Sequence, residues 1–228
     1  MKETPSVDAS ARSPHRKYAG KDASTRQAER RDKLLVAGVD LIGTKGFVAT
    51  TIDDVCREAG LTKRYFYESF ENREALLTTA FEGVTWELLQ RIGKAAAAHA
   101  RDARALVRTG VRETFAFVAE HPAKGQLMMI EAMSVRSQLG RLYVKQFGAF
   151  VELVLSLTRS FLPPDTATEA ELTVMARGVI GAIIHLCQGW IATDFKQPID
   201  ELVAGTVRIF AGIGRELGIP DWMDPAHP

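Results

Sequence analysis

Apolar side chains recur every three to four residues along most of the chain, which is the spacing of one face of an α-helix. The first stripe predicts a helix at about residues 25–45, and Gly46 follows at the left-handed position that commonly ends a helix. A later stripe predicts a longer helix from Asn72 toward residue 98. No segment shows the sustained alternation of apolar and polar residues typical of a half-buried strand, so the sequence predicts an all-α fold.

Two short helices are predicted between these long ones. Thr51 stands three residues before Asp54, as an N-cap residue does before its acidic partner, and Gly60 ends the helix that starts there. Thr62 is placed to cap the next helix. Two short helices joined by a tight, glycine-containing turn are typical of a helix-turn-helix, whose second helix enters the major groove of DNA. The pattern therefore predicts this motif over residues 51–70.

The second short helix carries an unusual number of aromatic residues. Phe66 and Phe70 are four positions apart and share a helix face, so we expect them to pack in the core. The other prominent side chains lie mostly away from that face: Lys63, Arg64, Tyr65 and Tyr67. Cations are mildly unfavourable at a helix N-terminus, and contact with DNA would explain their presence. A solvated pair of cations is the alternative interpretation.

The ordered residues of this region resemble the N-terminal domain of the TetR family of bacterial transcriptional regulators. The matching positions cover about 50 residues, from Leu34-Leu35 through Gly46-Phe47 and TTIDDVCREAGLTKRYFYESF to Arg73-Glu74-Ala75-Leu76. The resemblance implies a set of DNA-contacting residues: Thr51, Thr62, Lys63, Arg64, Tyr65, Tyr67 and Arg73. It places Tyr67 against a phosphate or a thymine methyl group and makes Arg73 a phosphate clamp. Glu68 either accepts from a cytosine amine or points into solvent.

The rest of the chain is predicted to form a larger helical domain, which the resemblance implies is used for ligand binding and dimerisation. Breaks in the helical pattern fall at Arg101-Asp102, His121-Pro122, residues 134–137, Pro163-Pro164 and Pro198. We therefore divide the chain into four parts: a disordered arm at 1–24, a helix-turn-helix DNA-binding domain at 25–72, a ligand-binding and dimerisation domain at 73–220, and a flexible tail at 221–228.

Two C-terminal segments are apolar on more than one side. The first carries Gly178, Gly181 and Gly189 beside an apolar stripe, and the second resembles it in pattern over residues 199–213. A helix with two apolar faces has to be buried twice, once in its own subunit and once in a partner. Because proteins that read DNA in this way bind pseudo-palindromes as dimers, we expect a homodimer through these two C-terminal helices.

Aromatic residues and methionines are spread over the middle helices, with a few polar residues among them. A mostly apolar pocket with few polar groups is typical of a small-molecule site. We therefore expect a hydrophobic small-molecule effector, with these candidate contacts: Trp86, Phe117, Met129, Met133, Phe150 and His185. Ordinary core packing is the alternative for each residue. The resemblance implies that the effector favours a form whose two reading helices no longer match successive major grooves, about 34 Å apart.

Composition and motifs exclude several classes. The net charge of +1 gives no global attraction to nucleic acid, so DNA binding requires a local patch. Cys56 and Cys187 form no metal-ligand pattern, and we expect two buried thiols in a reducing cytoplasm. The chain has neither a secretory signal nor an unbroken apolar window of about 18 residues, so we expect a soluble cytoplasmic protein without a membrane partner.

No G-x-S-x-G, H-E-x-x-H, phosphate loop or recognisable carboxylate pair is present, and the five histidines are scattered. We therefore expect no enzyme activity, no catalytic residues, no metal and no cofactor. The favoured interpretation is a ligand-released repressor that binds a pseudo-palindromic operator as a homodimer. A helical interaction protein, or an activator with the same fold, is the alternative.

Overall fold

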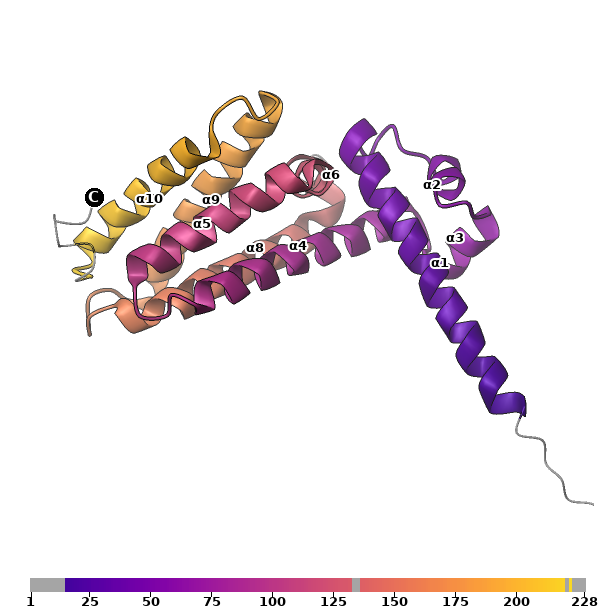
Figure 1. Ribbon diagram of the computed structural model, residues 1–228, viewed down its shortest axis with the longest axis horizontal. Helices are drawn as coiled ribbons and strands as arrows, with labels where there is room; N and C mark the ends of the chain where they lie inside the picture. Colours follow the sequence, from indigo (N-terminus) through magenta and orange to yellow (C-terminus); the bar gives the residue numbers. More distant parts are fainter. Residues whose placement is uncertain (1–14, 133–135, 220–221, 223–228) are drawn as a thin grey trace, which may run out of the picture.

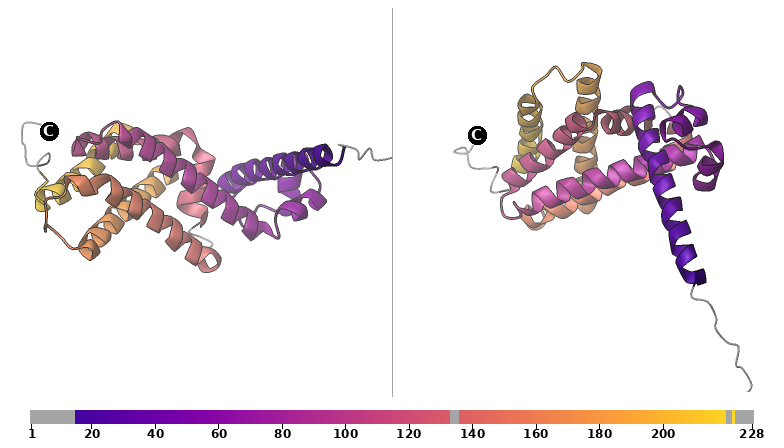
Figure 2. Two further views of the ribbon diagram at one scale, coloured as in Figure 1. Left: turned by 90° about the horizontal axis from the view of Figure 1, so that it is seen from below. Right: turned by 45° about the vertical axis from the view of Figure 1, so that its right-hand side comes forward.

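The computed structural model describes residues 15–132, 136–219 and Trp222. Within that range every regular element is a helix, which confirms the predicted all-α fold (Figure 1). Three N-terminal helices gather at one end of an elongated bundle formed by the remaining ones, as the three views in Figures 1 and 2 show. Predicted Met133 lies outside the described residues.

The N-terminal unit is built from α1 (His15–Lys45), α2 (Ile52–Glu58) and α3 (Lys63–Ser69). Helix α1 begins well before the predicted start near residue 25, so the second part of the arm expected at 1–24 is helical. Extending an existing helix by one residue costs far less than nucleating a new one, which explains how so polar a segment continues the helix. Its N-terminal half projects away from the other helices (Figure 1).

The ends of α1, α2 and α3 follow the predicted signals. Gly46 adopts a φ of 85° directly after α1, and Gly60 adopts a φ of 65° between α2 and α3. Thr51 and Asp54 form the predicted capping box: the Thr51 hydroxyl accepts from the Asp54 N–H at 3.1 Å, and the Asp54 carboxylate accepts from the Thr51 N–H at 3.1 Å. These ends fix the turn that sets α3 against α2.

The larger unit continues, in the part of the chain that the structure describes, with eight further elements. They are α4 (Arg73–Ala97), α5 (Ala103–Glu120), α6 (Pro122–Gln126), the π-helix η1 (Leu127–Glu131), α8 (Arg136–Thr158), the 3-10 helix η2 (Arg159–Phe161), α9 (Glu169–Ala192) and α10 (Ile199–Glu216). Asp102 caps α5, Pro122 opens α6 and Pro198 precedes α10, at breaks that the sequence predicts. The sequence pattern did not predict the π-helix.

Buried residues of the described chain form two main cores. The smaller one joins α1, α2, α3 and the start of α4, and its centre is Phe66, which is 0% exposed. Phe70 is buried beside it, so both rings are core residues as predicted. The larger core runs through the bundle but also includes Ile42 and Phe47, from the end of α1 and the loop after it. The N-terminal unit is therefore packed directly against the bundle.

Candidate nucleic-acid interface and effector cavity

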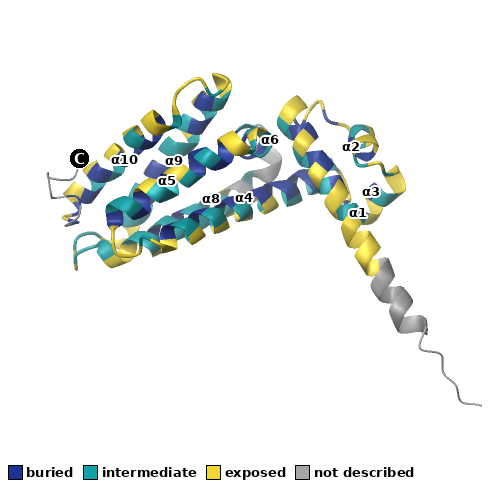
Figure 3. Cartoon of the chain, viewed as in Figure 1, coloured by how far each residue is buried: buried dark blue, intermediate teal, exposed yellow. Residues whose placement is uncertain are grey.

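Helix α3 presents one buried face and one exposed face. Phe66 and Phe70 hold it against the smaller core, while Lys63, Arg64 and Tyr67 are exposed. Figure 3 shows exposed positions on the N-terminal unit around α3. The Tyr67 side chain is 58% exposed, although its ring contacts the edge of Phe66 at a centroid distance of 5.6 Å. The described chain thus carries a cationic, tyrosine-bearing tip on a rigidly packed helix.

Each cation of this tip has an acidic neighbour. Lys63 Nζ lies 2.9 Å from Asp53 Oδ1, and the hydrogen bond to this carboxylate raises the pKa of Lys63. Arg64 Nε lies 3.0 Å from Glu68 Oε1, one turn along the same helix. Glu68 therefore pairs with Arg64. Ion pairs as exposed as these contribute little to stability, so phosphate oxygens can replace the carboxylates at small cost.

Tyr65 and the arginines of α1 are less accessible than the tip. The Tyr65 side chain is half-buried, and the Arg30 guanidinium lies 4.4 Å above its ring centroid. Arg31 donates to the Ser69 carbonyl and lies 4.2 Å from the Phe70 ring centroid. Arg31 therefore ties α1 to the end of α3, which stabilises the orientation of the reading helix.

The two predicted threonines lie at helix starts on the exposed side of the unit. Hydrogen bonding from the Thr51 side chain is the main reason that the pKa of Asp54 falls to about 2, with the Thr51 N–H and Arg57 adding to it. Thr62 is exposed at the N-cap of α3, and its side chain makes no capping hydrogen bond. Thr62 directly precedes Lys63 of the cationic tip, whereas the Thr51 hydroxyl is hydrogen-bonded to Asp54.

Arg73 holds the loop between α1 and α2. Its Nη1 donates to the carbonyl oxygen of Thr50 at 2.5 Å, and the guanidinium lies 4.9 Å from the centroid of the Phe47 ring. The side chain is half-buried. Its first role in the structure is thus to fix this loop, and only the donors that remain are available to the phosphate that the sequence led us to expect.

A cavity lies inside the bundle, between α4, α5, α8, α9 and η1. The surrounding side chains leave about 980 Å³ of space, counting the open mouth, and none of the described residues that line it is charged. Its polar lining, among those residues, consists of three threonines and one glutamine: Thr85, Thr114, Thr158 and Gln146. A second, smaller apolar cavity shares Val107, Val154, Thr158 and Phe210 with the first, so the two cavities are adjacent.

Two of the six predicted effector contacts line this cavity, Met129 and Phe150. Three others lie elsewhere, which corrects the expectation of one shared pocket. Trp86 is 64% exposed, because Thr85 and Leu88 take the inward positions of α4. Phe117 is buried away from the cavity, with its ring against His121, and His185 is exposed on the outer side of α9.

Cavity-lining residues that sequence reasoning missed share the inward helical phase of their helices. Examples are Phe81, Leu88 and Ile92 on α4, and Val107 and Val111 on α5. Their spacing predicts burial but does not separate a lined cavity from a filled core, because both need the same apolar face. Only the packing of the other helices decides between the two.

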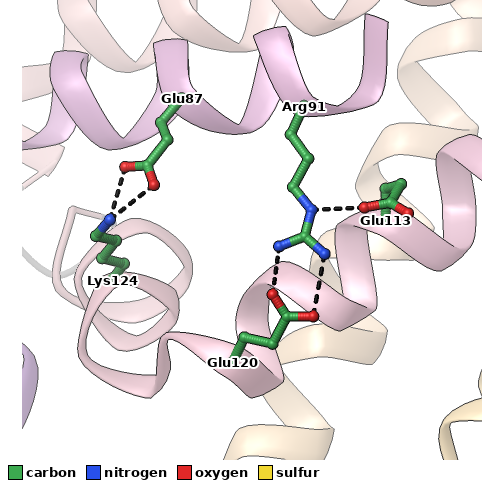
Figure 4. Close-up of polar contacts among 5 residues, drawn as sticks. All are labelled: Glu87, Arg91, Glu113, Glu120 and Lys124. Atoms are coloured by element: carbon green, nitrogen blue, oxygen red, sulfur yellow. Dashed lines mark hydrogen bonds and ion pairs between the residues drawn. The ribbon is translucent and has the colours of Figure 1, made fainter. Parts of the chain in front are cut away.

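Ion pairs lock α4 to the helices beside it. Arg91 on α4 reaches two carboxylates of α5, with Nε 2.5 Å from Glu113 and Nη1 2.6 Å from Glu120 (Figure 4). Hydrogen bonding from Arg91 is the main cause that lowers the pKa of Glu120. Nearer the N-terminal unit, Lys124 of α6 lies 2.7 Å from Glu87 of α4. Helices α4, α5 and α6 are thus cross-linked by charge.

The outer face of α9 carries several exposed glycines beside Val174 and His185, and nothing in the described chain covers it. Added Cβ atoms at Gly178, Gly181 and Gly189 would meet nothing within 4 Å, and Val174 is 67% exposed. Among the described helices α9 alone is long and apolar enough to span a membrane by length and composition, and 22% of its apolar window is buried. One such helix is weak evidence for a membrane span, and its bare face equally suits a protein partner.

Comparison of sequences finds that the chain is similar to transcriptional regulators. The model of the family described as bacterial regulatory proteins, tetR family, matches residues 34–80. The chain is 23% identical over 194 residues to the uncharacterized HTH-type transcriptional regulator YerO of Bacillus subtilis, covering 79% of this chain and 66% of that protein. It is 24% identical over 185 residues to the HTH-type transcriptional activator FasR of Mycolicibacterium smegmatis, covering 81% and 82%.

Solved structures share the fold beyond the N-terminal unit. The fatty acid degradation regulator FadR from Bacillus halodurans is similar with a TM-score of 0.66 at 16% identity, covering 79% of this chain and 93% of that one. FadR from Bacillus subtilis, solved in complex with stearoyl-CoA, has a TM-score of 0.65 at 14% identity, covering 78% and 95%. The tetR family model thus covers the N-terminal unit and the start of α4, and the solved structures share the fold of most of the chain.

Proposed function

We propose that this regulator is a repressor that binds a pseudo-palindromic operator as a homodimer and is released from it by an apolar effector. One observation carries the proposal: a single helix, α4, belongs to both functional parts. Its first turn packs in the smaller core through Leu76, and further along Phe81 and Leu88 line the cavity. A ligand that shifts α4 therefore also shifts the DNA-binding unit. We keep the boundaries of this unit at residues 25–72.

The DNA contacts are proposed on exposure. Lys63, Arg64 and Tyr67 lead into the major groove, and Thr51 and Thr62 approach the phosphates on either side. On DNA, phosphate oxygens replace Asp53 and Glu68 as partners of the two cations. Tyr65 and Arg73 are secondary contacts, because each is half-buried and already engaged with the protein. Release of counterions from the phosphates supplies the salt-dependent part of the affinity.

The effector is proposed to be a long apolar chain with a polar head outside the cavity. A charge inside the cavity would find no charged partner among the described lining residues, and burying an unpaired charge is very costly. Two adjacent apolar cavities suit a long chain better than a compact ring system. The Bacillus subtilis FadR structure contains stearoyl-CoA, so a long-chain acyl-CoA is the first compound to test.

The dimer is proposed to form through the outer faces of α9 and α10. The glycines of α9 allow close approach of a second backbone, and on α10 Gly205, Gly212 and the 45% exposed Ile209 face outward. The opposite face of α10 is buried in its own subunit through Leu202 and Val203. These helices therefore satisfy both requirements of the expected four-helix interface, one face inside and one available to a partner.

DNA binding is tested with a duplex recovered by in vitro selection with the wild-type protein. Lys63→Ala/Arg64→Ala removes two cations from each subunit, and we expect it to weaken DNA binding by at least about a hundredfold. The slope of the logarithm of the binding constant against the logarithm of salt concentration should become less steep by about 0.9 for each lost phosphate contact. Lys94→Ala/Arg108→Ala removes the same charge from exposed positions on the bundle and serves as the control. Unchanged binding by the first variant would remove α3 as the reading helix.

Effector release is tested by titrating stearoyl-CoA into the protein–DNA complex, with coenzyme A as the control that lacks the chain. We expect stearoyl-CoA alone to dissociate the complex. If stearoyl-CoA binds the protein and strengthens the complex instead, the proposed class of effector is supported, but the proposed release of the repressor by the effector is refuted.

An activator remains the second candidate, because the relative FasR is named as one. In vitro transcription from the natural promoter distinguishes the two, since an activator raises the transcript level on binding.

A further inference from the structure

One short segment touches the cavity, the dimer helix and the DNA-binding unit. The π-helix η1 spans Leu127–Glu131, and π-helical turns are rare, short and frequent at functional sites. Converting such a turn to α-helix removes one residue from the register, which rotates the residues after it by about 100° and shifts them by about 1.5 Å. A small rearrangement within η1 therefore moves its last side chain substantially.

The middle of η1 faces the cavity. Met128 and Met129 both line it, and methionine side chains adapt readily to a ligand because they are long, unbranched and polarisable. The Gln188 side chain of α9 donates to the Met129 carbonyl oxygen at 2.8 Å. This bond gives a partner to a backbone carbonyl of the irregular turn and attaches η1 to the proposed dimer helix.

The end of η1 reaches the DNA-binding unit. Glu131 Oε2 accepts a hydrogen bond from the Phe47 backbone N–H at 2.8 Å, across 84 positions of sequence. Phe47 belongs to the loop that precedes α2, and Arg73 holds the far end of the same loop at Thr50. Hydrogen bonds to a carboxylate are stronger than those between neutral groups, so this contact is suited to fixing the loop.

We propose that Glu131 is the positioning residue that transmits occupancy of the cavity to the reading helices, an inference that rests on the proposed effector-controlled function. An apolar chain displaces Met128 and Met129, η1 changes register, and the Glu131 carboxylate leaves the Phe47 N–H. The loop before α2 is then free to shift, and α2 and α3 change their orientation relative to the bundle. Without this bond the cavity still binds its ligand, but the DNA-binding unit no longer responds.

The test measures the coupling between two binding events. The coupling factor is the ratio of the stearoyl-CoA dissociation constants with and without the selected duplex, and by linkage it equals the effect of stearoyl-CoA on DNA affinity. The variants are Glu131→Ala, which removes the acceptor, and Glu131→Gln, whose side-chain oxygen can accept the same N–H. Glu152→Ala, an exposed carboxylate on α8, is the control.

We expect a wild-type coupling factor of at least about fivefold, retained by Glu131→Gln and by the control, and a factor within about twofold of one for Glu131→Ala. Because wild-type protein has to break the Glu131–Phe47 bond when it binds, stearoyl-CoA affinity of the free protein should rise in Glu131→Ala and stay unchanged in Glu131→Gln and the control. A purely structural role for Glu131 would instead lower the melting temperature and leave the coupling intact, and wild-type coupling in Glu131→Ala overturns the proposal.

A ligand-free arm separates this proposal from the choice of effector. Gly110 lines the cavity on α5, and Gly110→Leu fills part of the space in place of a ligand. If wild-type protein does not bind stearoyl-CoA, the proposed effector class fails, and the coupling is read from DNA affinity in the cycle of Gly110→Leu, Glu131→Ala and the double variant. We expect Gly110→Leu to change DNA affinity severalfold only when Glu131 is present. Additive effects, or none from Gly110→Leu, overturn the role of Glu131.

Discussion

A glycine of α1 packs tightly against the bundle, and substituting it is the sharpest test of how the N-terminal unit and the bundle are joined. A Cβ added at Gly43 of α1 would lie 2.2 Å from the carbonyl oxygen and 2.5 Å from the Cα of Ala123, at the start of α6. Both atoms belong to backbone, so no side-chain rotation relieves the clash. Gly43→Ala therefore has to push α6 away from α1.

Two opposing effects set the size of the change. Overpacking of this kind costs about 1–3 kcal/mol, and a contact so short with backbone belongs in the upper half of that range. Replacing a helical glycine by alanine stabilises the helix by about 1 kcal/mol. We therefore expect a net loss of about 1–2 kcal/mol, which lowers the melting temperature of a chain this long by about 2–8 °C.

The assay is thermal unfolding followed by helical circular dichroism, with Gly83→Ala as the matched control. Gly83 is an exposed glycine in α4, and an added Cβ there meets nothing within 4 Å. Only the propensity gain applies to it, so we expect its melting temperature to rise by about 2–4 °C. If Gly43→Ala is as stable as Gly83→Ala, then α1 and α6 are not in tight contact. The tight junction described between the N-terminal unit and the bundle would then be refuted.

The two rings on opposite faces of α3 should separate stability from DNA binding. Phe66→Ala is expected to cost about 3–5 kcal/mol and to unfold the smaller core, whereas Tyr67→Ala should keep the melting temperature and weaken DNA binding in a gel-shift assay. Equal loss of stability in the two variants would contradict the orientation of α3. Because the pKa of Asp54 is lowered to about 2, its carboxylate stabilises the fold when the pH is above the ordinary pKa of an aspartate, about 4. This stabilisation is lost as the pH falls from about 4 to about 2, so Asp54→Asn should remove that part of the acid dependence of unfolding. Burial raises the pKa of the Cys187 thiol to about 12, and we expect it to resist a thiol reagent at about pH 8 until the protein is denatured; rapid labelling of the native protein would show that α9 is not packed as described.

Much of the fold follows from local signals in the sequence. Each of these signals acts within a few residues, so the sequence alone predicts it. They are the capping box at Thr51, the left-handed glycines and the proline breaks. The assignment of Phe66 and Phe70 to the core succeeded for the same reason, because a spacing of four fixes a shared face. Both cysteines are buried and free, as expected.

The cavity and its link to the DNA-binding unit could not be predicted from local sequence signals. The residue type of Trp86 predicts an effector contact, but its phase on α4 directs the side chain outward. Thr85, next to it, is fully buried and lines the cavity, and a lone threonine carries no sequence signal for such a role. The π-helix depends on contacts with α9 and with the α1–α2 loop, which are far away in sequence.

The two cores constrain how the DNA-binding unit is able to move. Leu34 and Leu41 of α1 belong to the smaller core, whereas Ile42, the next residue, belongs to the larger one. Bending α1 between them would strain both cores at once, and packed cores resist continuous deformation. We therefore expect the unit to move as a rigid body and not by bending of α1. Loss of the Glu131–Phe47 hydrogen bond, on the side of the unit that faces the bundle, would then be passed to α3 by movement of the whole unit.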